Sequence, residues 1–367
     1  MSYIFIASEA ELAQTCEQLS NEPAVAVDTE FKRETSYFPI PCLMQISARG
    51  YTVCIDLLAI KDLSPLKKIL FNKNTLKIFH AARQDLELFY YMFNEVPSPI
   101  YDTQIGASFL GGDNQIGYAN LVAQVLNITL DKSQTRTDWT RRPFTKKQLD
   151  YAANDVIYLF KLYQQQHQEL LEKQRLSWCE QDFQRLTLID LYEPSTELAW
   201  KKIKNYQRLS LNQKCIAYRL AKWRETIAIN NNKTRNLIFK NGTLLDLAYK
   251  APNNLDELEN ISELNSRTIN SYGESLIAEI SSALQMNKDE CPSTKDYLKL
   301  TDEQSTLLNN VLQSVELKAK SNNVDPKVIC SKKELEKIIR GKRDSILFED
   351  WRYEFIGKEI LSQLPNQ

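Results

Sequence analysis

Two carboxylates near the start of the chain have a type and spacing that could support metal chemistry. Asp28 and Glu30 directly follow the apolar run at residues 24–27. Side chains two residues apart on a strand point to the same face, so both carboxylates should project together at a strand end. Like charges this close repel each other, and they stay ionised easily only when a cation lies between them. The alternative for this pair is a solvated turn.

Three further residues could join them. Asp85 is expected just inside a helix that follows a strand, where a plain helix-dipole role is the alternative. Tyr151 and Asp155 lie four residues apart on a predicted helix, so phenol and carboxylate share one face. For an isolated pair of this kind, the edge of an amphipathic helix is the simpler interpretation.

The elements that must position these residues alternate between strand and helix patterns. Strands are expected at 3–7, 24–27, 42–47, 51–56, 76–79 and 100–101, and helices at 8–19, 64–71 and 83–93. Ser8 with Glu11, and Thr145 with Gln148, have the spacing of helix capping boxes. The second to fourth strands have short connections, which favours antiparallel pairing. The pattern predicts an α/β domain over residues 1–180, a mixed sheet with flanking helices.

The rest of the chain is predicted to be helical. We expect a helical connector at 181–204 and two all-α bundles at 205–290 and 295–367, separated by a linker near Asp289–Ser293. The 367 residues are enough for two or three domains. No run approaches the roughly 18 apolar residues of a membrane span, and the start lacks a signal-peptide pattern. We therefore expect a soluble, cytoplasmic protein.

Charge and cysteine content narrow the function classes. The net charge is −1, but residues 1–195 carry 19 Lys and Arg against 24 Asp and Glu, whereas residues 196–290 carry 14 against 11. An acidic first part with a basic second part is typical of a metal-using site joined to a nucleic-acid-binding module. The seven cysteines are scattered and never spaced as CxxC, so we expect buried reduced thiols and no zinc site.

The combination of the five residues is more specific than any of its parts. A D-x-E after a strand, an Asp 55 residues on and a Y-x-x-x-D 66 to 70 residues further form the ordered signature of the DEDD exonucleases, and the tyrosine marks the DEDDy branch. The sequence around these positions resembles ribonuclease D, most strongly between residues 24 and 163. The residues that carry this resemblance are Asp28–Phe31, Tyr37, Pro41, Leu43, Gln45, His80–Asp85, Leu130–Lys132 and Trp139–Pro143.

The resemblance implies a ribonuclease H-like sheet and a 3′→5′ exoribonuclease that releases nucleoside 5′-monophosphates from precursor tRNAs and other small structured RNAs. Such hydrolysis uses two divalent cations about 3.5–4 Å apart. An all-carboxylate ligand set favours Mg²⁺ or Mn²⁺. By resemblance Asp28 bridges both ions, Glu30 and Asp155 lie on the nucleophile side, and Asp85 helps to hold the other ion. Tyr151 would orient the attacking water, since its ordinary pKa near 10 makes it a poor base.

RNA contacts are expected from two groups of basic residues. Lys132, Arg136, Arg141 and Arg142 surround Trp139 in a polar loop, where phosphate contact and plain solvation are both open. Residues 205–280 resemble an HRDC domain, in which Trp223 should pack in the core and Lys222 and Arg224 could contact RNA. Residues 295–367 would be a second, more divergent copy.

Two other functions compete with this interpretation. A DEDD exonuclease that acts on DNA would share the carboxylates, although the HRDC-like segments argue against it. A catalytically inactive RNA-binding scaffold would be expected to have lost at least one ligand, and here all four are present. No stable protein partner is predicted.

Overall fold

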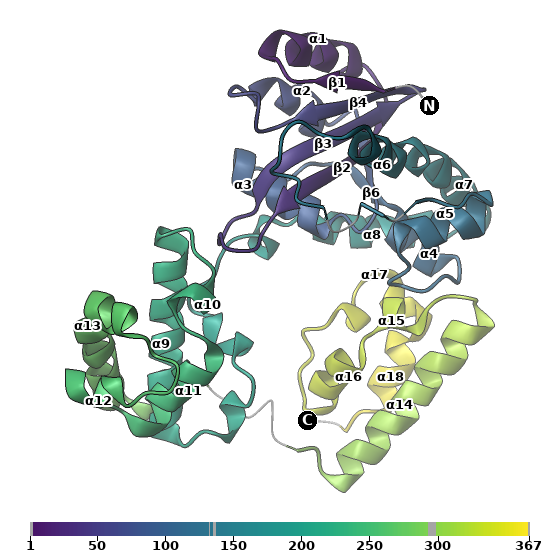
Figure 1. Cartoon of the computed structure of the whole chain (residues 1–367). Coiled ribbons are helices and arrows are strands. Elements are labelled where there is room, and N and C mark those ends of the chain that lie inside the picture. Colours follow the sequence, from purple (N-terminus) through teal and green to yellow (C-terminus); the bar gives the residue numbers. More distant parts are fainter. Residues whose placement is uncertain (1–2, 132, 135–136, 293–298, 366–367) are drawn as a thin grey trace. The chain divides into compact units, whose positions relative to one another are not determined.

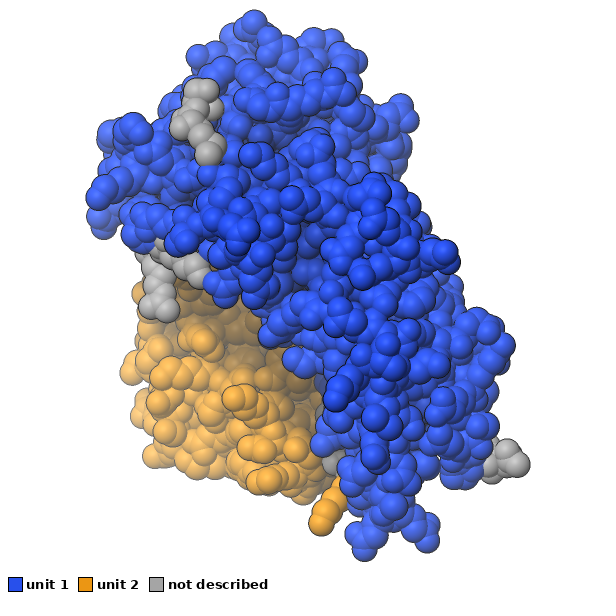
Figure 2. Space-filling model, turned by 90° about the vertical axis from the view of Figure 1, so that its right-hand side faces the viewer, with its two compact units in different colours: residues 1–32, 41–192, 300–367 blue, residues 33–40, 193–299 orange. Residues whose placement is uncertain are grey.

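The computed structural model describes residues 3–131, 133–134, 137–292 and 299–365. They form two compact units, coloured separately in Figure 2. Unit 1 comprises residues 1–32, 41–192 and 300–367, and unit 2 comprises residues 33–40 and 193–299. Each unit has its own buried core.

Unit 1 is built around a six-stranded mixed sheet in the order β1-β4-β3-β2-β5-β6 (Figure 1). The strands are β1 (Ile4–Ile6), β2 (Ala24–Lys32), β3 (Ile40–Ala48), β4 (Tyr51–Asp56), β5 (Leu76–Phe79) and β6 (Ile100–Asp102). β3 and β4 are antiparallel, whereas β1 pairs with β4, β2 with β5, and β5 with β6 in parallel. The predicted mixed sheet is confirmed, with β2 longer than the sequence indicated.

Helices cover this sheet. They are α1 (Glu9–Leu19), α2 (Lys67–Leu70), α3 (Arg83–Phe93), α4 (Thr103–Phe109), α5 (Tyr118–Leu126), α6 (Lys146–Ile157), α7 (Leu159–Glu172) and α8 (Leu176–Leu186). The predicted capping box of α6 is present, because Thr145 and Gln148 cap that helix reciprocally. At α1 the Ser8 hydroxyl accepts from the Glu11 amide and donates to the Glu11 carboxylate, which is an N-cap without the reciprocal backbone bond. α6 packs against β2 and β4, and α7 against β2 and β5.

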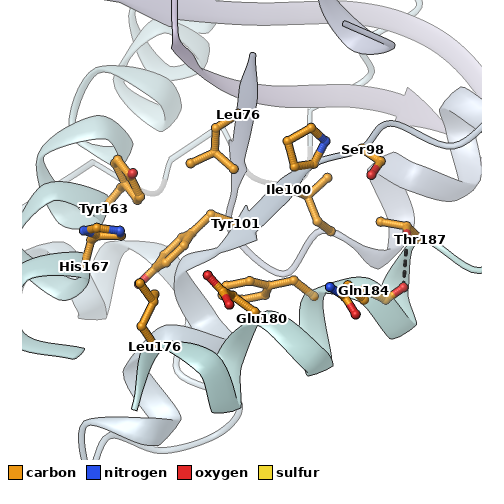
Figure 3. Close-up of a pocket in the computed structure, with 12 residues that line it drawn as sticks. Leu76, Ser98, Ile100, Tyr101, Tyr163, His167, Leu176, Glu180, Gln184 and Thr187 are labelled. Carbon is orange, nitrogen blue, oxygen red and sulfur yellow. Dashed lines mark hydrogen bonds between the residues drawn. The ribbon is translucent and has the colours of Figure 1, made fainter. Parts of the chain in front are cut away.

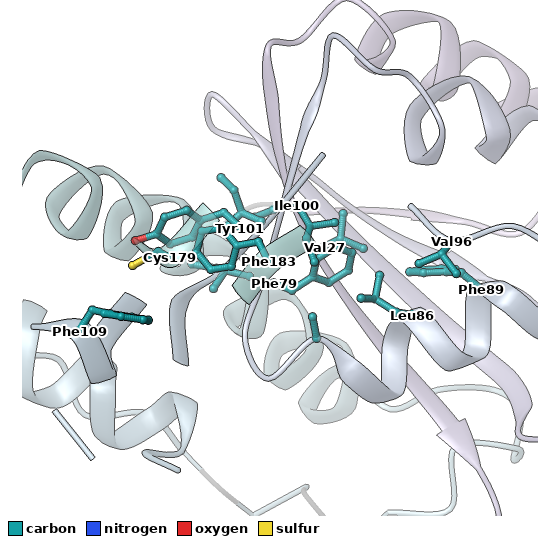
Figure 4. Packing of buried hydrophobic residues seen from close by; sticks show 14 of the residues in the cluster. Val27, Phe79, Leu86, Phe89, Val96, Ile100, Tyr101, Phe109, Cys179 and Phe183 are labelled. Carbon is teal, nitrogen blue, oxygen red and sulfur yellow. The ribbon is translucent and has the colours of Figure 1, made fainter. Parts of the chain in front are cut away.

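Apolar packing fixes the elements that carry the candidate site. Figure 4 shows Val27 of β2 and Phe79 of β5 among the buried side chains, with Leu86 and Phe89 of α3 beside them. All four are fully buried. Burying side chains of this size stabilises the fold by roughly 1.5–3 kcal/mol each. The strand and the helix are therefore held in a fixed relation.

The last helical segment shares the core of unit 1. Its helices are α14 (Asp302–Ser321), α15 (Pro326–Ile329), α16 (Lys332–Ile339), α17 (Asp350–Arg352) and α18 (Lys358–Gln363). Trp351 stacks on Trp178 of α8 with ring centroids 4.5 Å apart, and the buried Arg352 forms an ion pair with Asp182 at 2.8 Å. The sequence indicated a separate bundle here, whereas the structure makes the segment part of the sheet-containing unit.

Unit 2 is a helical bundle of α9 (Leu211–Asn230), α10 (Arg235–Ile238), α11 (Asn241–Lys250), α12 (Leu255–Glu259) and α13 (Ser266–Gln285). Only short 3₁₀ turns, at Ile189–Leu191, Ala199–Lys202 and Tyr206–Arg208, lie between α8 and α9. Trp223 packs against this core, stacked on Phe239 with ring centroids 6.1 Å apart.

The connection between β2 and β3 also belongs to unit 2. Tyr37 is buried there, and its hydroxyl donates to the Glu225 carboxylate at 2.5 Å. The Phe38 amide donates to the Asn232 side chain at 3.0 Å. A segment that directly follows the strand of Asp28 and Glu30 is thus packed into the helical bundle.

One cysteine pair corrects the prediction of seven reduced thiols. Cys215 of α9 and Cys291 form a disulfide, with Cα atoms 5.3 Å apart. The two residues are 76 positions apart in sequence, so no local spacing indicates the pairing. Cys16, Cys42, Cys54, Cys179 and Cys330 are buried free thiols, as expected. Within the described parts of the chain, no helix has both the length and the apolar character that a membrane crossing requires.

Candidate metal centre and active site

Three of the predicted ligands meet between a strand and a helix. Asp28 and Glu30 lie inside β2, which continues to Lys32, and not at its end as predicted. Their shared face points to Asp155 of α6, and carboxylate oxygens of the three residues lie within 4.8 Å of one another. All three are partly buried. β2 and α6 pack together, and this contact unites residues that are far apart in sequence.

Asp85 lies beside this cluster in the first turn of α3. Its buried carboxylate accepts a hydrogen bond at 2.5 Å from the hydroxyl of Thr29, the residue between the two β2 carboxylates. The charge of Asp28 raises the pKa of Asp85, and the charge of Asp85 raises the pKa of Glu30. The structure therefore brings together all four predicted carboxylates, three within one tight cluster and the fourth held next to it by Thr29.

Burial raises the pKa of every member, and neighbouring charges raise it further at Asp28, Glu30 and Asp85. Burial is the larger cause at Asp28 and Asp85, and the charges of Asp155 on Asp28 and of Asp28 on Asp85 raise each pKa further. The pKa of Glu30 rises to about 10 through burial and then the three neighbouring carboxylates. Burial raises the pKa of Asp155 to about 7, against a lowering hydrogen bond from Tyr151. Such a cluster holds its charges easily only around cations.

Tyr151 occupies the position that its spacing predicted, one turn before Asp155 on α6, and donates to that carboxylate. Its ring lies 6.2 Å from the ring of the buried Trp139, which limits its movement. A cavity of about 190 Å³ adjoins Tyr151 and Asp155 and is also lined by Tyr118 and Leu130.

Sequence reasoning missed Tyr118 of α5. Its hydroxyl donates to the Asn154 carbonyl at 2.9 Å. Burial, and then the charges of Asp155 and Asp28, raise its pKa well above the ordinary value. Tyr118 lies outside the spaced signature, and only the packing of α5 brings it near the carboxylates.

Asp102 and His80 organise the turn that leads to Asp85. Asp102 is the N-cap of α4 and accepts from the Gln104 amide at 2.8 Å. It also accepts from the Ala81 and Ala82 amides at 3.0 and 2.8 Å, just before α3 begins. The His80 ring bonds to Thr103 and to the Ile116 carbonyl.

The basic loop has a different role at Arg142 from the predicted phosphate contact. Its guanidinium binds both oxygens of the buried Asp56, at 2.5 and 2.7 Å, and donates to the carbonyls of Cys42 and Trp139. All three nitrogens are thereby occupied, and the residue ties the loop to the sheet. Arg141 is 84% exposed and lies 3.5 Å from Asp138. Lys132 and Arg136 lie outside the described residues.

The prediction of an RNA contact is wrong for Arg224. The residue is 2% exposed, and its guanidinium donates to the Phe239 carbonyl at 2.9 Å and to Asn241 at 2.7 Å. Its spacing could have shown this, because the buried residues Ala217, Leu220, Ala221, Arg224 and Ala228 follow one face of α9. Lys222 is exposed and forms an ion pair with Glu197.

The sheet and the carboxylate cluster are those of a class of exonuclease. The sequence pattern of the family described as "3'-5' exonuclease" matches residues 3–171, and that of the HRDC domain matches residues 213–280. Ribonuclease D of Zymomonas mobilis is 36% identical, with 99% of this chain and 94% of the relative covered. Ribonuclease D of Sphingobium indicum is 34% identical over the same shares.

A solved structure agrees with these relatives. Escherichia coli RNase D, described as an exoribonuclease involved in structured RNA processing, aligns with a TM-score of 0.90 and 29% identity, covering 99% of this chain and 98% of that one. The chain belongs to the ribonuclease D family. It is a 3′→5′ exoribonuclease with an α/β nuclease domain and an HRDC domain.

Proposed function

We propose that the protein releases nucleoside 5′-monophosphates from RNA 3′ ends, with Asp28, Glu30, Asp85 and Asp155 as ligands of two divalent cations. The observation that carries this proposal is the cluster of Asp28, Glu30 and Asp155, whose ligand atoms lie within 4.8 Å of one another. Asp85 adds a fourth carboxylate beside it.

The chemistry of the ligand set fits Mg²⁺ or Mn²⁺. All four groups are hard oxygen donors, and the described cluster contains neither His nor Cys, which zinc would favour. Four negative charges balance two divalent ions, which removes the repulsion that raises these pKa values. When bound, the cations activate a water molecule and stabilise the departing 3′ oxygen.

Tyr151 is the group that we assign to positioning. Its hydroxyl donates to the Asp155 carboxylate. A water molecule inserted into this hydrogen bond would lie between the phenol and the carboxylate. Trp139 supports the ring from one side. The cavity beside Tyr151, Tyr118 and Leu130 is open for the last nucleotide of the RNA.

A cleavage assay tests the reaction. The purified chain receives a labelled unstructured RNA or the matched DNA, with Mg²⁺, with Mn²⁺ or with chelator. We expect a ladder that shortens from the 3′ end of RNA, monophosphate products, and no cleavage with chelator. Equal cleavage of DNA would favour the DNA exonuclease. Binding without cleavage in any metal would favour the inactive scaffold.

We further propose that the substrates are precursor tRNAs and other small structured RNAs. The HRDC domain and the similarity to E. coli RNase D, described as acting in structured RNA processing, support this. The test compares a tRNA-like RNA bearing a 3′ extension with the extension alone. We expect the tRNA-like substrate to be bound more tightly and trimmed to its stem. Equal affinity and rate for both would contradict the substrate assignment.

A further inference from the structure

A second cavity, of about 310 Å³, lies in unit 1 at the end of the sheet opposite the carboxylates (Figure 3). Leu76 and Ile100, the first residues of β5 and β6, line it. β2 runs parallel to β5 with Ala26 beside Ile78, so Asp28 lies past the carboxyl end of β5. At about 3.3 Å per strand residue, the four steps from Leu76 to the level of Asp28 span roughly 13 Å. The cavity is therefore distinct from the candidate active site.

One side of this cavity is aromatic. The ring centroids of Tyr101 and Phe183 lie 4.8 Å apart, those of Tyr101 and Tyr163 4.9 Å apart, and those of Tyr163 and His167 5.3 Å apart. Figure 3 shows Tyr101 of β6 near Tyr163 and His167 of α7, and Phe183 belongs to α8. Tyr101 and Phe183 are buried, so their rings belong to the core and form a firm surface. They hold the partly exposed ring of Tyr163, on which a flat apolar ligand could stack.

Four polar side chains that line the cavity are available to hydrogen-bond a ligand. The side chains of Tyr163, His167, Glu180 and Gln184 make no hydrogen bond or ion pair with any residue that the structure describes. They include donors and acceptors, and no Lys or Arg is among the lining residues. A purely apolar ligand would leave these groups unpaired, and a phosphate would meet Glu180 with no fixed cation opposite it.

The loop that leads into β6 forms one edge of the cavity, and Lys77 holds this loop in place. The fully buried Lys77 donates to the carbonyls of Asn72, Thr75 and Ser98 at 2.9, 2.8 and 2.7 Å. Ser98 lines the cavity, so this contact fixes the loop at its edge. The size of the cavity is at the lower end of the roughly 300–1,000 Å³ typical of ligand sites. It is thus large enough for a small ligand, and its edge is held by the core of the unit.

We propose that this cavity binds a nucleobase, stacked on the partly exposed ring of Tyr163 and hydrogen-bonded at its edge by His167, Glu180 or Gln184. A nucleobase is planar and uncharged and carries both donors and acceptors along its edge. Its face suits the Tyr163 ring, and its edge suits the polar side chains that line the cavity. The base could belong to an unpaired nucleotide of the RNA or to a free nucleoside. The first source rests on the ribonuclease function, whereas the second does not.

Adenosine and ribose are the probes for the first arm, titrated into the full-length protein and followed by calorimetry or ligand-observed NMR. We expect adenosine to bind with a Kd on the order of 1 mM and ribose not to bind. Gln184→Trp places a large side chain at the opening of the cavity, from an exposed position of α8. Tyr163→Leu removes the ring on which the base would stack. Each should weaken adenosine binding about tenfold or more. Gln164→Ala, on an exposed part of α7 outside the cavity, is the control and should bind as wild type.

The second arm identifies the source of the base. An unstructured RNA is titrated against Asp28→Asn protein with and without Gln184→Trp. Weaker RNA binding assigns the site to a base of the RNA, and unchanged RNA binding with lost adenosine binding assigns it to a free nucleoside. The proposal is overturned when wild-type protein does not bind adenosine, or when both cavity variants, with unchanged melting temperatures, bind it as wild type does. Gln184→Trp should cleave a short RNA normally, so a failure here is separable from a failure of the carboxylate mechanism.

Discussion

Asp28 and Asp155 come from a strand and a helix that lie far apart in sequence, and their charges repel each other across a partly buried site. A site of this kind is less stable without its cations than a neutral one would be. The same repulsion provides the driving force for binding divalent ions. Stability and activity should therefore respond in opposite directions when a ligand is neutralised.

Asp28→Asn tests this opposition directly. We expect cleavage to fall by orders of magnitude, because Asp28 would contact both ions. The metal-free protein should melt a few degrees higher than wild type, because a repulsive charge is gone. Gel-based cleavage and thermal melts in chelator measure the two effects. Activity within tenfold of wild type in a folded variant would rule out the assigned ligand role.

Tyr151→Phe removes only a hydroxyl. The ring contact with Trp139 should survive, and metal binding should persist, whereas turnover should fall by roughly 10²–10⁴-fold. Single-turnover rates at saturating Mg²⁺ provide the measurement. Tyr118→Phe is a useful comparison, since its hydroxyl donates to a backbone carbonyl and is not assigned to the water. An unchanged rate for Tyr151→Phe would leave this residue with a packing role only.

The raised pKa of Asp155 predicts a pH dependence of stability. The ordinary value is 3.8 and the folded, metal-free value is about 7, so between these values the folded protein holds a proton that the unfolded chain has lost. The contribution of Asp155 to the free energy of unfolding is thus fully present at low pH and is lost as pH rises toward about 7. Mg²⁺ competes with that proton, so its stabilising effect should be larger near about pH 8 than near about pH 6. Thermal melts with and without Mg²⁺ at both pH values would show this. The opposite order would contradict the assignment.

At the scale of elements, the connection after β2 is held by a buried ion cluster in unit 2. Glu225 of α9 is fully buried and binds Arg235, the Tyr37 hydroxyl at 2.5 Å and Lys202 at 3.4 Å. Burial alone would raise the pKa of Glu225, but the hydrogen bonds from Arg235 and Tyr37 outweigh it, and the pKa lies below its ordinary value. The carboxylate is therefore charged and has to stay paired.

Glu225→Ala should destabilise unit 2 strongly. It leaves Arg235 and Tyr37 without their shared partner, and breaking a buried pair costs roughly 3–5 kcal/mol. Tyr37→Phe removes one hydrogen bond and should cost only about 0.5–1.5 kcal/mol. Urea unfolding measures both, with Glu274→Ala on the exposed part of α13 as the control. Equal small losses for Glu225→Ala and Glu274→Ala would mean that the cluster is not structurally important.

At the scale of the whole molecule, residues 300–367 belong with the nuclease sheet. Trp351 lies 8% exposed against Trp178 and Phe109, and Arg352 reaches across to Asp182. By sequence alone, a chain cut near Arg185 keeps the complete nuclease signature, since all five signature residues lie before Val156. In the structure such a fragment would expose apolar surface that α17 normally covers.

Trp351→Ala measures that packing without a truncation. We expect the free energy of unfolding of unit 1 to fall by roughly 3–5 kcal/mol. The nuclease fold would then depend on a residue that is far in sequence from the five signature positions. Leu361→Ala, at a position 40% exposed, should cost far less. A protein that ends at residue 292 should aggregate or melt lower than the full chain. Normal stability of both Trp351→Ala and the shortened chain would mean that the segment docks only weakly.

The sequence by itself determined the local part of this protein. Spacings of two and four residues put Asp28 with Glu30 and Tyr151 with Asp155 on shared faces, and the caps at Ser8 and Thr145 marked helix starts correctly. These features depend on the periodicity of single elements, which neighbouring residues fix. The ordered signature added the family, since it records which elements follow one another.

Tertiary structure alone decided which faces meet. It brought Tyr118 beside Asp155, buried Arg224, tied Arg142 to Asp56 and paired Cys215 with Cys291. In each case the partners lie on different elements. The local sequence around a charged or polar residue does not indicate whether its side chain faces water or a neighbouring element. The same reason explains the C-terminal segment, whose helical pattern could not indicate that its apolar side packs on the nuclease core.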